Sequence, residues 1–578
     1  MSAQADSIAR PTPASRLEGL RPYSAGTQRF AIDLRLDANE GAPDGRLLGA
    51  LGGVDAETLR RYSDAGALGE KIAERWGVGP ERVVVTAGGD DAIDRLLRAT
   101  LEPGRSMVMH DPTFVMIPIG AALAQGEVRR VAWTDGAFPT DAYIDAIDGT
   151  TALVAIVTPN NPTGCVVPMD AVRAIVDRAS EVGAVVMVDL AYAEFADEDP
   201  TRELLGHEHV AVVRTFSKAR GLAGLRVGYA LCSETVAGWL RTVGSPYPVS
   251  TLSLALASAS LDDDGAVDTH VRAVREERGR LASLLDDLGA RTLPTGANYV
   301  SARFADAGFV RDALASQGVS VRGFAPNPAI EDLLRITLPG GAAAFDRLER
   351  ALRVAMAPEA LLLDLDGVLA DVSASYRGAI VATGRSYGVD ITGGDIAAAK
   401  RAGDANNDWA LTRRLLRERG VDAPLEEVTE RFQAVYLGTG GSPGLRERET
   451  LIVDRPALET LSALTRLAIV TGRPRDEAEW FLERAGVLDL FETLVCMEDA
   501  PAKPSPEPVR RAMERLGVTR VWMVGDTPDD IASVRSAGGI GIGVEAPGER
   551  DGSARGAMLD AGAACVLDGF DGLTGLLA

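Results

Sequence analysis

Short apolar runs that end abruptly at Gly, Pro, Asn, Asp or Ser recur along this 578-residue chain, and they limit its fold more than any other feature. In the first 260 residues such runs alternate with helix-like segments, as in "ERVVVTAGG", "TALVAIVTPNNPTG" and "GAVVMVDLAY". This pattern is typical of buried strands in a layered α/β domain. Because open α/β sheets bind ligands at the carboxyl ends of their strands, the polar residues that close these runs are candidate site residues.

The chain is too long for one hydrophobic core, and changes in the pattern predict where it divides. We expect a first part over residues 1–357, with a large α/β domain at about 55–260 and a small α+β domain formed by the N-terminal arm and about 261–357. A second, doubly wound α/β part over 358–578 begins near "LLLDLDG" and contains a helical insert at about 375–450. Almost no linker separates the two parts.

Charge and cysteine usage exclude several classes of partner. The formal net charge of −23 argues against nucleic acid or an anionic membrane as the main partner, because both are bound through clustered Lys and Arg. No run of about 18 apolar residues predicts a membrane span. The four cysteines are far apart and form no CxxC pair, which fits a reducing compartment. We therefore expect a cytoplasmic protein that binds small molecules.

The segment "RTFSKARGLAGLRVGY" places Lys218 between a strand-like run and a glycine-rich turn. An amine that reacts with a phosphate-bearing carbonyl compound needs an anion pocket nearby, and Ser217 and Arg226 can supply one. Upstream, Asp189 ends a strand-like run, where a buried carboxylate can keep a pyridine nitrogen protonated. Lys218 is therefore the candidate catalytic residue of the first part.

Further residues complete this candidate cofactor site. Tyr192 and Asn161 can hydrogen-bond a ring oxygen, and the start of a helix offers backbone N–H groups to an anion at Gly88, Gly89 and Asp90. Each signal is weak by itself, since a lone Lys after Ser is most often a surface residue and "NPTG" alone is a good turn. Their occurrence together and in order indicates a cofactor site.

On these motifs, residues from about 15 to 356 resemble a fold-type-I pyridoxal-phosphate aminotransferase. Within that class, "LEGLRPYSAG", "RLDANEGAP", "RRYSD" and "LRITLP" resemble the histidinol-phosphate aminotransferase family. One departure from the family pattern is present: the usual Asn-Glu-Asn-Pro is here Asn39-Glu40-Gly41-Ala42-Pro43. The resemblance implies pyridoxal 5'-phosphate as the cofactor and glutamate as the amino donor.

The resemblance also implies roles for residues around the substrate. Phe114 is expected to stack on the cofactor ring, and Tyr62 to reach the cofactor phosphate of a partner subunit, which implies a homodimer. Arg335 is expected to receive the substrate carboxylate, with Tyr23 and Arg322 helping to hold a substrate phosphate. For Tyr23 and Arg322, the alternative of ordinary surface residues stays open.

In the second part, Asp364 and Asp366 lie two residues apart at the end of an apolar run. Such a pair can divide labour, because one carboxylate can attack phosphorus while the other donates and later accepts a proton. Asp526 and Asp530 in "GDTPDD" can bind Mg²⁺ together with Asp364 and the backbone oxygen of Asp366. The four residues predict metal-dependent phosphoryl chemistry.

Two more residues of this part can hold phosphoryl oxygens: the Thr471 hydroxyl and the Lys503 ammonium. The ordered set "DLDGVL", "TGR", "KPSP" and "GDTPDD" resembles the haloacid dehalogenase-like superfamily over about 360–578. The resemblance implies an aspartyl-phosphate intermediate at Asp364 and a helical cap formed by the insert. Dehalogenase relatives lack the second aspartate, so Asp366 favours a phosphatase.

An aminotransferase that makes a phosphorylated amine and a phosphatase that removes the phosphate are consecutive steps. The resemblance therefore suggests conversion of imidazole-acetol phosphate and glutamate to histidinol phosphate, then hydrolysis to histidinol, in histidine biosynthesis. Three alternatives stay open: another phosphorylated amino compound in specialised metabolism, an amino-acid-phosphate decarboxylase fused to a phosphatase, and a non-enzymatic fusion in which one half regulates the other.

Overall fold

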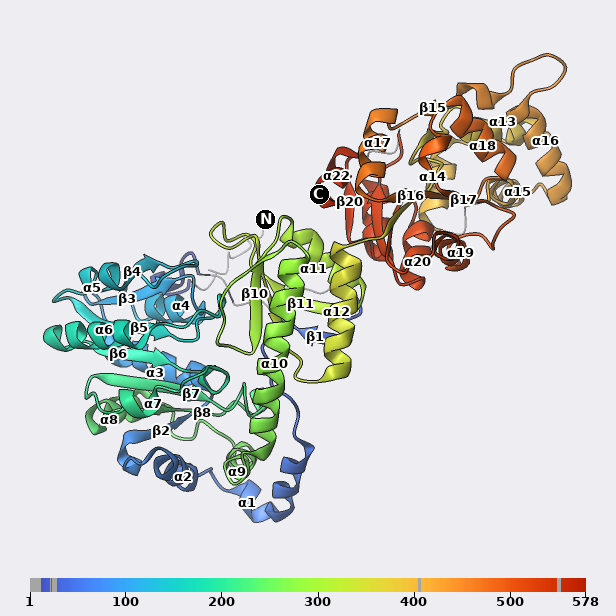
Figure 1. Ribbon diagram of the computed structural model, residues 1–578. Coiled ribbons are helices and arrows are strands. Elements are labelled where there is room, and N and C mark those ends of the chain that lie inside the picture. The colour runs from blue at the N-terminus through green and yellow to red at the C-terminus, as the bar shows by residue number, and fades with distance from the viewer. Residues whose placement is uncertain (1–11, 21, 23–28, 404–406, 548–551, 578) are drawn as a thin grey trace, which may run out of the picture. The chain divides into compact units, whose positions relative to one another are not determined.

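The computed structural model describes residues 12–20, 22, 29–403, 407–547 and 552–577 (Figure 1). The chain divides into two compact units. Unit 1 consists of residues 1–26, 36–305 and 322–345, and unit 2 consists of residues 27–35, 306–321 and 346–578. The expected domain boundary near residue 357 remains a prediction, because unit 2 also takes in segments that precede it.

Unit 1 is built around a seven-stranded sheet with the strand order β2-β8-β7-β6-β5-β3-β4. β8 runs antiparallel to both of its neighbours, and the other pairs are parallel. The strands are β2 Val83–Thr86, β3 Ser106–Asp111, β4 Glu127–Ala132, β5 Thr151–Val157, β6 Val185–Asp189, β7 Val210–Thr215 and β8 Gly228–Leu231. Apolar runs in the sequence predicted all of these strands except β4, which is mostly polar and largely exposed.

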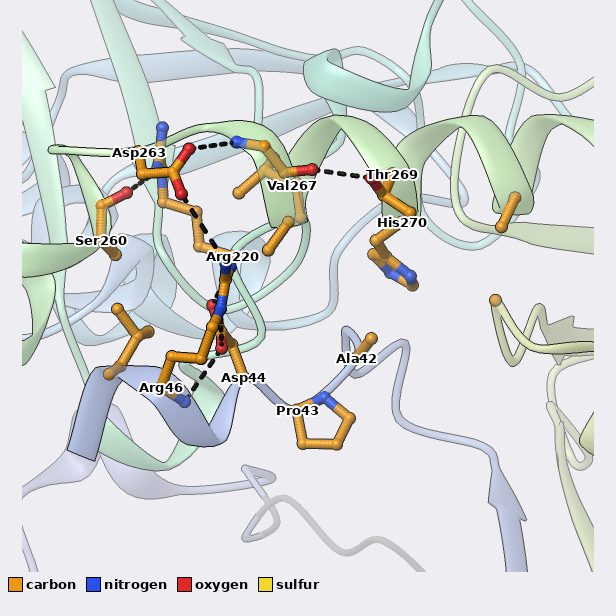
Figure 2. Close-up of a pocket in the computed structure, with 16 residues that line it drawn as sticks. Ala42, Pro43, Asp44, Arg46, Arg220, Ser260, Asp263, Val267, Thr269 and His270 are labelled. Atoms are coloured by element: carbon orange, nitrogen blue, oxygen red, sulfur yellow. Dashed lines mark hydrogen bonds and ion pairs between the residues drawn. The ribbon is translucent and has the colours of Figure 1, made fainter. Parts of the chain in front are cut away.

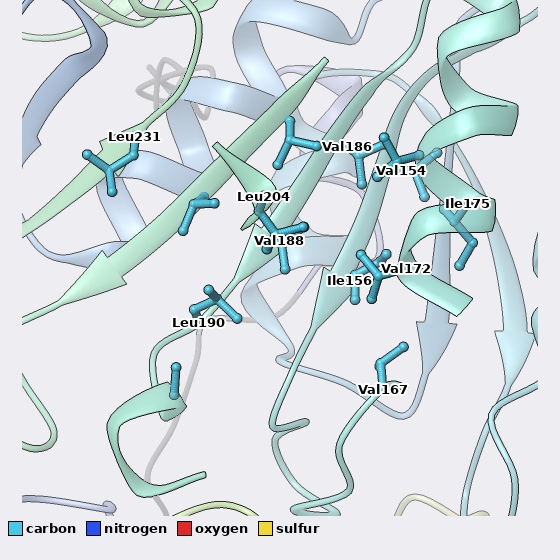
Figure 3. Close-up of a cluster of buried hydrophobic side chains, with 14 of the residues drawn as sticks. Val154, Ile156, Val167, Val172, Ile175, Val186, Val188, Leu190, Leu204 and Leu231 are labelled. Carbon is cyan, nitrogen blue, oxygen red and sulfur yellow. The ribbon is translucent and has the colours of Figure 1, made fainter. Parts of the chain in front are cut away.

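Both faces of this sheet are covered, which explains why the runs are apolar without interruption. In β5, Val154 and Ile156 point to the face covered by α6, Met169–Val182 (Figure 3). Leu153, Ala155 and Val157 point to the opposite face, covered by α3, Gly89–Thr100. Full burial of a Val, Leu or Ile side chain contributes about 1.5–3 kcal/mol. The layered core therefore fixes the strand ends that carry the candidate residues.

The remaining helices of unit 1 flank the sheet or lead to a smaller one. They are α1 Ala56–Arg60, α2 Gly66–Trp76, α4 Met116–Leu123, α5 Thr140–Asp145, α7 Thr201–Leu204, α8 Glu234–Val243, α9 Thr251–Ser260 and α10 Gly265–Asp287. The 23-residue α10 carries many charged side chains. Among the described residues, no helix is both long and apolar enough to cross a membrane.

The smaller sheet has the order β1-β11-β12-β10-β9. Its strands are β1 Leu34–Leu36, β9 Arg291–Thr292, β10 Tyr299–Arg303, β11 Val319–Gly323 and β12 Leu333–Thr337, and two helices accompany it, α11 Ala307–Ser316 and α12 Ala342–Met356. Within unit 1, the antiparallel pair β11 and β12 places Arg322 opposite Arg335.

Unit 2 contains a parallel sheet with the order β17-β16-β13-β18-β19-β20. The strands are β13 Ala360–Leu363, β16 Arg466–Val470, β17 Thr493–Val495, β18 Val521–Gly525, β19 Ile540–Val544 and β20 Cys565–Leu567. Because β13 lies between β16 and β18, the residues that follow these three strands meet at one edge of the sheet. The predicted doubly wound pattern is present.

Helices complete unit 2. Those around the sheet are α17 Arg455–Leu464, α18 Arg475–Arg484, α19 Glu507–Leu516, α20 Pro528–Ser536, α21 Ser553–Ala561 and α22 Asp571–Leu577. Between β13 and β16, a two-stranded ribbon of β14 Ala370–Asp371 and β15 Thr450–Leu451 frames a helical insert. The insert consists of α13 Tyr376–Ser386, α14 Gly393–Arg401, α15 Asp408–Glu418 and α16 Leu425–Leu437. We call these four helices the cap.

Candidate active sites

The loop that follows β7 carries Lys218, and we call it the lysine loop. It packs closely on the segment from Ala38 to Ala42. Lys218 Nζ donates to the Ala38 carbonyl oxygen at 3.1 Å and lies 5.7 Å from the centre of the Tyr192 ring. A Cβ atom at Gly41 would lie 1.9 Å from the Lys218 carbonyl oxygen, and one at Gly221 would lie 2.1 Å from the Ala42 oxygen. The two segments thus touch through their backbones, which only glycine permits.

Asp189, at the end of β6, is a buried carboxylate whose negative charge is only weakly stabilised by its neighbours. Its Oδ1 accepts a hydrogen bond from the Ala191 backbone N–H at 3.0 Å. Burial raises the pKa of Asp189 to about 7, although that backbone hydrogen bond and the charges of Lys218 and Arg214 act to lower it. A carboxylate in this state fits a ligand that brings a positive charge, such as a protonated pyridine nitrogen.

Tyr192 is held by a residue whose role the sequence analysis missed. The Tyr192 hydroxyl accepts a hydrogen bond from Asn39 Nδ2 at 2.9 Å, and Thr337 Oγ1 donates to Asn39 Oδ1 at 3.0 Å. Asn39 is buried and has a left-handed backbone with φ 55°. Asn tolerates this conformation better than most residues, so an Asn at this position was a weak signal.

The predicted phosphate-binding residues of unit 1 lie where α3 begins. Arg226 NH2 pairs with Asp90 Oδ2 at 2.8 Å, and a Cβ atom at Gly88 would lie 2.6 Å from the same guanidinium nitrogen. The Gly88 N–H itself donates to the Thr86 oxygen, which leaves the next amides, those of Gly89 and Asp90, at the free end of the helix. Among the other predicted residues, Ser217 accepts a hydrogen bond at Oγ from Thr215 Oγ1 at 2.9 Å. The donors suit a phosphate.

A cavity of about 750 Å³ brings the predicted substrate residues of unit 1 together. Phe114, Asn161, Arg322 and Arg335 all line it. Arg335 is buried, and it donates to Asn161 Oδ1 at 2.5 Å and to the Asp37 oxygen at 2.7 Å. Asn161 therefore contacts Arg335 here, whereas the sequence analysis expected it at a cofactor oxygen. Two guanidinium groups on one wall make the cavity suitable for anions.

The predictions for Tyr62, expected at the partner subunit, and Tyr23, expected at the substrate, fare differently. Tyr62 is 82% exposed and stacks on Tyr247, with 4.6 Å between ring centres. Its expected contact with a partner subunit stays a prediction. Tyr23 lies outside the described residues.

A second cavity of unit 1, about 410 Å³, lies on another side of the lysine loop (Figure 2). Its lining includes Ala42, Arg220 and His270, and Arg220 forms an ion pair with Asp264 at 2.7 Å. Neither ring nitrogen of His270 has a hydrogen-bond partner among the residues that the structure describes. None of its lining residues lines the 750 Å³ cavity, so the two cavities are separate.

In unit 2, Asp364, Asp526 and Asp530 form a carboxylate cluster. Asp364 follows β13, and the other two follow the adjacent β18. One oxygen of each lies within 4.8 Å of one oxygen of the others, and all three side chains are buried. A Cβ atom at Gly367, which has φ 74°, would lie 2.2 Å from Asp526 Oδ2. Three converging carboxylates fit a hard divalent cation such as Mg²⁺.

Lys503 lies inside this cluster. Its Nζ is 2.9 Å from Asp364 Oδ1 and 2.5 Å from Asp530 Oδ1, and it donates to the Val470 oxygen at 3.1 Å. Burial alone would lower the pKa of Lys503, but Asp364 and Asp530 outweigh it and raise that pKa. Thr471 directly follows β16, beside β13. The structure thus brings the predicted nucleophile, metal ligands and phosphoryl donors to one sheet edge.

Asp366 is held by a buried arginine that the sequence analysis did not single out. Arg473 is 1% exposed at its side chain, and its Nε donates to Asp366 Oδ1 at 2.5 Å while NH1 donates to Glu449 Oε2 at 2.9 Å. The Tyr436 hydroxyl, from the cap, donates to the other oxygen of Glu449. The only sequence signal was the third letter of the motif "TGR".

Comparisons with known proteins assign a family to each of two stretches of the chain. Residues 47–352, more than half of the chain, match the family model of aminotransferase class I and II, and residues 358–538 match that of haloacid dehalogenase-like hydrolase. The chain therefore belongs to the aminotransferase class I and II family, and its C-terminal part is a haloacid dehalogenase-like hydrolase domain. The predicted α/β class and the predicted fusion are confirmed.

Individual relatives refine this assignment. A histidinol-phosphate aminotransferase of Halobacterium salinarum is 38% identical over 282 residues, which cover 46% of this chain and 76% of that protein. An imidazoleglycerol-phosphate dehydratase of Phytophthora nicotianae is 48% identical over 198 residues, 33% of this chain and only 44% of that protein. The crystal structure of histidinol-phosphate aminotransferase from Sinorhizobium meliloti in complex with pyridoxal-5'-phosphate aligns with TM-score 0.53, covering 61% of this chain and 99% of that one; at 24% identity this likeness shows the fold alone.

Proposed function

We propose that the protein catalyses two consecutive reactions, a pyridoxal-phosphate-dependent transamination with glutamate and a Mg²⁺-dependent hydrolysis of the phosphorylated product. The observation that carries the proposal is the presence of two complete sets of reactive residues in one chain, around Lys218 and around Asp364. The names of the two relatives support imidazole-acetol phosphate as the keto substrate, histidinol phosphate as the intermediate and histidinol as the product, within histidine biosynthesis.

Pyridoxal phosphate fits the residues of unit 1, because burial raises the pKa of Asp189 to about 7 and the missing side chain of Gly88 lets the Arg226 guanidinium approach the start of α3. Asp189 would hold the ring nitrogen, Tyr192 and Asn161 the ring oxygen, and Ser217 and Arg226 the phosphate. When bound, the cofactor supplies a carbonyl carbon and an electron-withdrawing ring for amino-group exchange. Lys218 Nζ moves the proton at the substrate carbon that carries the nitrogen.

The two arginines of the 750 Å³ cavity determine which substrates enter. Arg335 binds the carboxylate of glutamate in one half-reaction and the phosphate ester in the other, because a guanidinium fork holds either anion through paired hydrogen bonds. Arg322, directly opposite on β11, adds a second positive charge for the phosphorylated substrate. Phe114, which lines the same cavity, faces the cofactor ring.

In unit 2, an oxygen of Asp364 attacks phosphorus and the alcohol oxygen leaves. Asp366 donates the proton that the alcohol needs, then takes one from the water whose oxygen attacks phosphorus and frees Asp364. Lys503 and Thr471 bind the phosphoryl oxygens. Mg²⁺, which Asp364, Asp526, Asp530 and the Asp366 backbone oxygen would hold, adds positive charge at this site.

We also propose a cytoplasmic homodimer. Tyr62 and Tyr247 are exposed and stack on each other, Leu48 and Leu59 are also exposed, and exposed apolar side chains of this kind favour an interface. All four cysteines lie within the described residues and none forms a disulfide, which supports a reducing compartment. A monomer with full transaminase activity would contradict the dimer.

The two activities are separable by mutation, which provides the test. Lys218→Ala should remove the visible absorbance of bound cofactor and reduce transamination by at least about 10³-fold, with phosphate release unchanged. Asp364→Asn should do the reverse, because the sites lie in different units. Formation of 2-oxoglutarate and release of phosphate from histidinol phosphate are followed separately in the full-length protein. Retention of either activity in its own variant would refute the corresponding assignment.

A further inference from the structure

The cap helix α15 begins beside the phosphoryl site of unit 2. Its N-cap residue, Asn407, lines a cavity of about 40 Å³ together with Thr471 and Lys503. The next two residues along the helix are Asp408 and Trp409, and the Asp408 carboxylate interacts with the charges of Asp366 and Arg473 at this site. The proposed reaction assigns no role to either residue.

Asp408 is a buried carboxylate without a full set of partners. Its side chain is 9% exposed, and Oδ1 lies 3.9 Å from Lys400 Nζ, too far for a hydrogen bond. Among the described residues, neither Asp408 Oδ1 nor the Trp409 Nε1–H has a hydrogen-bond partner. Buried polar atoms are nearly always hydrogen-bonded, so two such atoms on successive residues indicate a ligand-binding position.

The charges around Asp408 show which ligand would fit. Burial raises the pKa of Asp408; Lys400, Arg377 and Arg473 lower it, whereas the charge of Asp366 raises it. Lys400 interacts with the catalytic aspartates as well as with Asp408, because the charges of Asp526 and Asp366 also raise its pKa. An ammonium group within hydrogen-bonding distance of Asp408 Oδ1 would give this buried carboxylate oxygen the partner that it lacks among the described residues.

We propose that Asp408 binds an ammonium group on the alcohol part of the substrate, so that the phosphatase site selects amino-alcohol phosphates. The proposal rests on the proposed hydrolysis at Asp364. An ammonium and a carboxylate form a charge-assisted hydrogen bond, and a buried carboxylate left unpaired by an amine-free ester is penalised. This selection would also set the order of the two reactions. The keto substrate of the transaminase lacks the ammonium and is not hydrolysed, whereas its amine product is hydrolysed.

The test measures an amine preference in the full-length protein with Mg²⁺. The probes are histidinol phosphate and its analogue with a hydroxyl in place of the amine, and a second matched pair, serinol phosphate and glycerol phosphate. The parent protein should prefer the amine of a pair by about 10- to 100-fold in kcat/KM, the effect of one charged hydrogen bond. Asp408→Asn should reduce this preference below about 3-fold by slowing only the amine, which also shows that the variant is folded.

Two variants serve as controls. Asp408→Glu should restore part of the preference, because it keeps the carboxylate. Glu426→Gln, which removes an exposed carboxylate from the first turn of α16 in the same cap, should leave the preference unchanged. An equal slowing of amine and hydroxyl esters by Asp408→Asn, or no amine preference in the parent, would overturn the inference. A preference for serinol phosphate without turnover of histidinol phosphate would support the inference and overturn only the proposed substrate.

Discussion

Two buried carboxylates at strand ends, Asp189 in unit 1 and Asp364 in unit 2, have opposite surroundings. The hydrogen bond that Asp189 Oδ1 accepts comes from a backbone N–H, and burial raises its pKa to about 7. Asp364 has the Lys503 ammonium at 2.9 Å, which also contacts Asp530. The first site needs a positive charge from its cofactor, whereas the second carries a cation of its own before any metal binds.

The two sites also differ in how they are assembled. The phosphatase residues follow neighbouring parallel strands, so the sheet alone brings them together. The transaminase site joins segments from Asn39 to Thr337, and the backbone of Gly41 packs so closely on the lysine loop that a Cβ atom would not fit. A site built by strand order depends mainly on charge, and one built by distant segments depends mainly on close packing.

Removal of the internal cation should have the largest effect. Lys503→Met should destabilise the phosphatase transition by about 3–5 kcal/mol, because it leaves Asp364 and Asp530 buried without a cation. Phosphate release should be lost, transamination should persist, and Mg²⁺ should restore part of the stability by binding the folded state. Denaturant unfolding with and without Mg²⁺ measures this. Arg511→Met, which breaks an exposed pair on α19, should change stability by less than about 0.5 kcal/mol; an equal effect of both would contradict the comparison.

A methyl group at Gly41 should test the dependence on close packing. Gly41→Ala places a Cβ 1.9 Å from the Lys218 oxygen, so the lysine loop must move, and we expect transamination to fall by about 100-fold. Phosphate release should not change. Gly45→Ala is the matched control, since no atom outside its own neighbourhood lies within 4 Å of a Cβ there. If Gly41→Ala has the activity of Gly45→Ala, the backbone contact does not position Lys218.

The smallest expected effect is the change with pH in the free energy of unfolding of the cofactor-free protein. The pKa of Asp189 is raised in the folded state, so the folded protein binds that proton more tightly than the unfolded chain, and stability falls as pH rises from about 4 through 7. Between pH 6 and 8 the loss should be about 1 kcal/mol. It should vanish in Asp189→Asn and in the cofactor-loaded parent, as measured by denaturant unfolding of the aminotransferase transition. A pH dependence that survives in Asp189→Asn has another source.

The sequence predicted the parts of both sites that depend on local pattern. A recognisable apolar run or motif marks each of four residues: Asp189 and Lys218 in unit 1, and Asp364 and Asp526 in unit 2. Strand order then brings the two residues of each site together. The partners of these residues were not predictable. Arg473 meets Glu449 only because the cap folds back on the sheet, and Asn39 reaches Tyr192 across 153 positions in the chain. Such contacts depend on tertiary packing, which no short pattern encodes.

Trp522, on the strand that leads to Asp526, has a consequence for where this chain can be divided. Its indole nitrogen donates to the Val354 oxygen of α12 at 2.8 Å, and its ring meets Phe309 of α11 edge to face, at 5.0 Å, all within unit 2. Phe309 belongs to the stretch that matches the aminotransferase family. A cut at the family boundary would therefore remove a ring that packs on this buried indole. An intact unit 2 needs residues from the aminotransferase stretch.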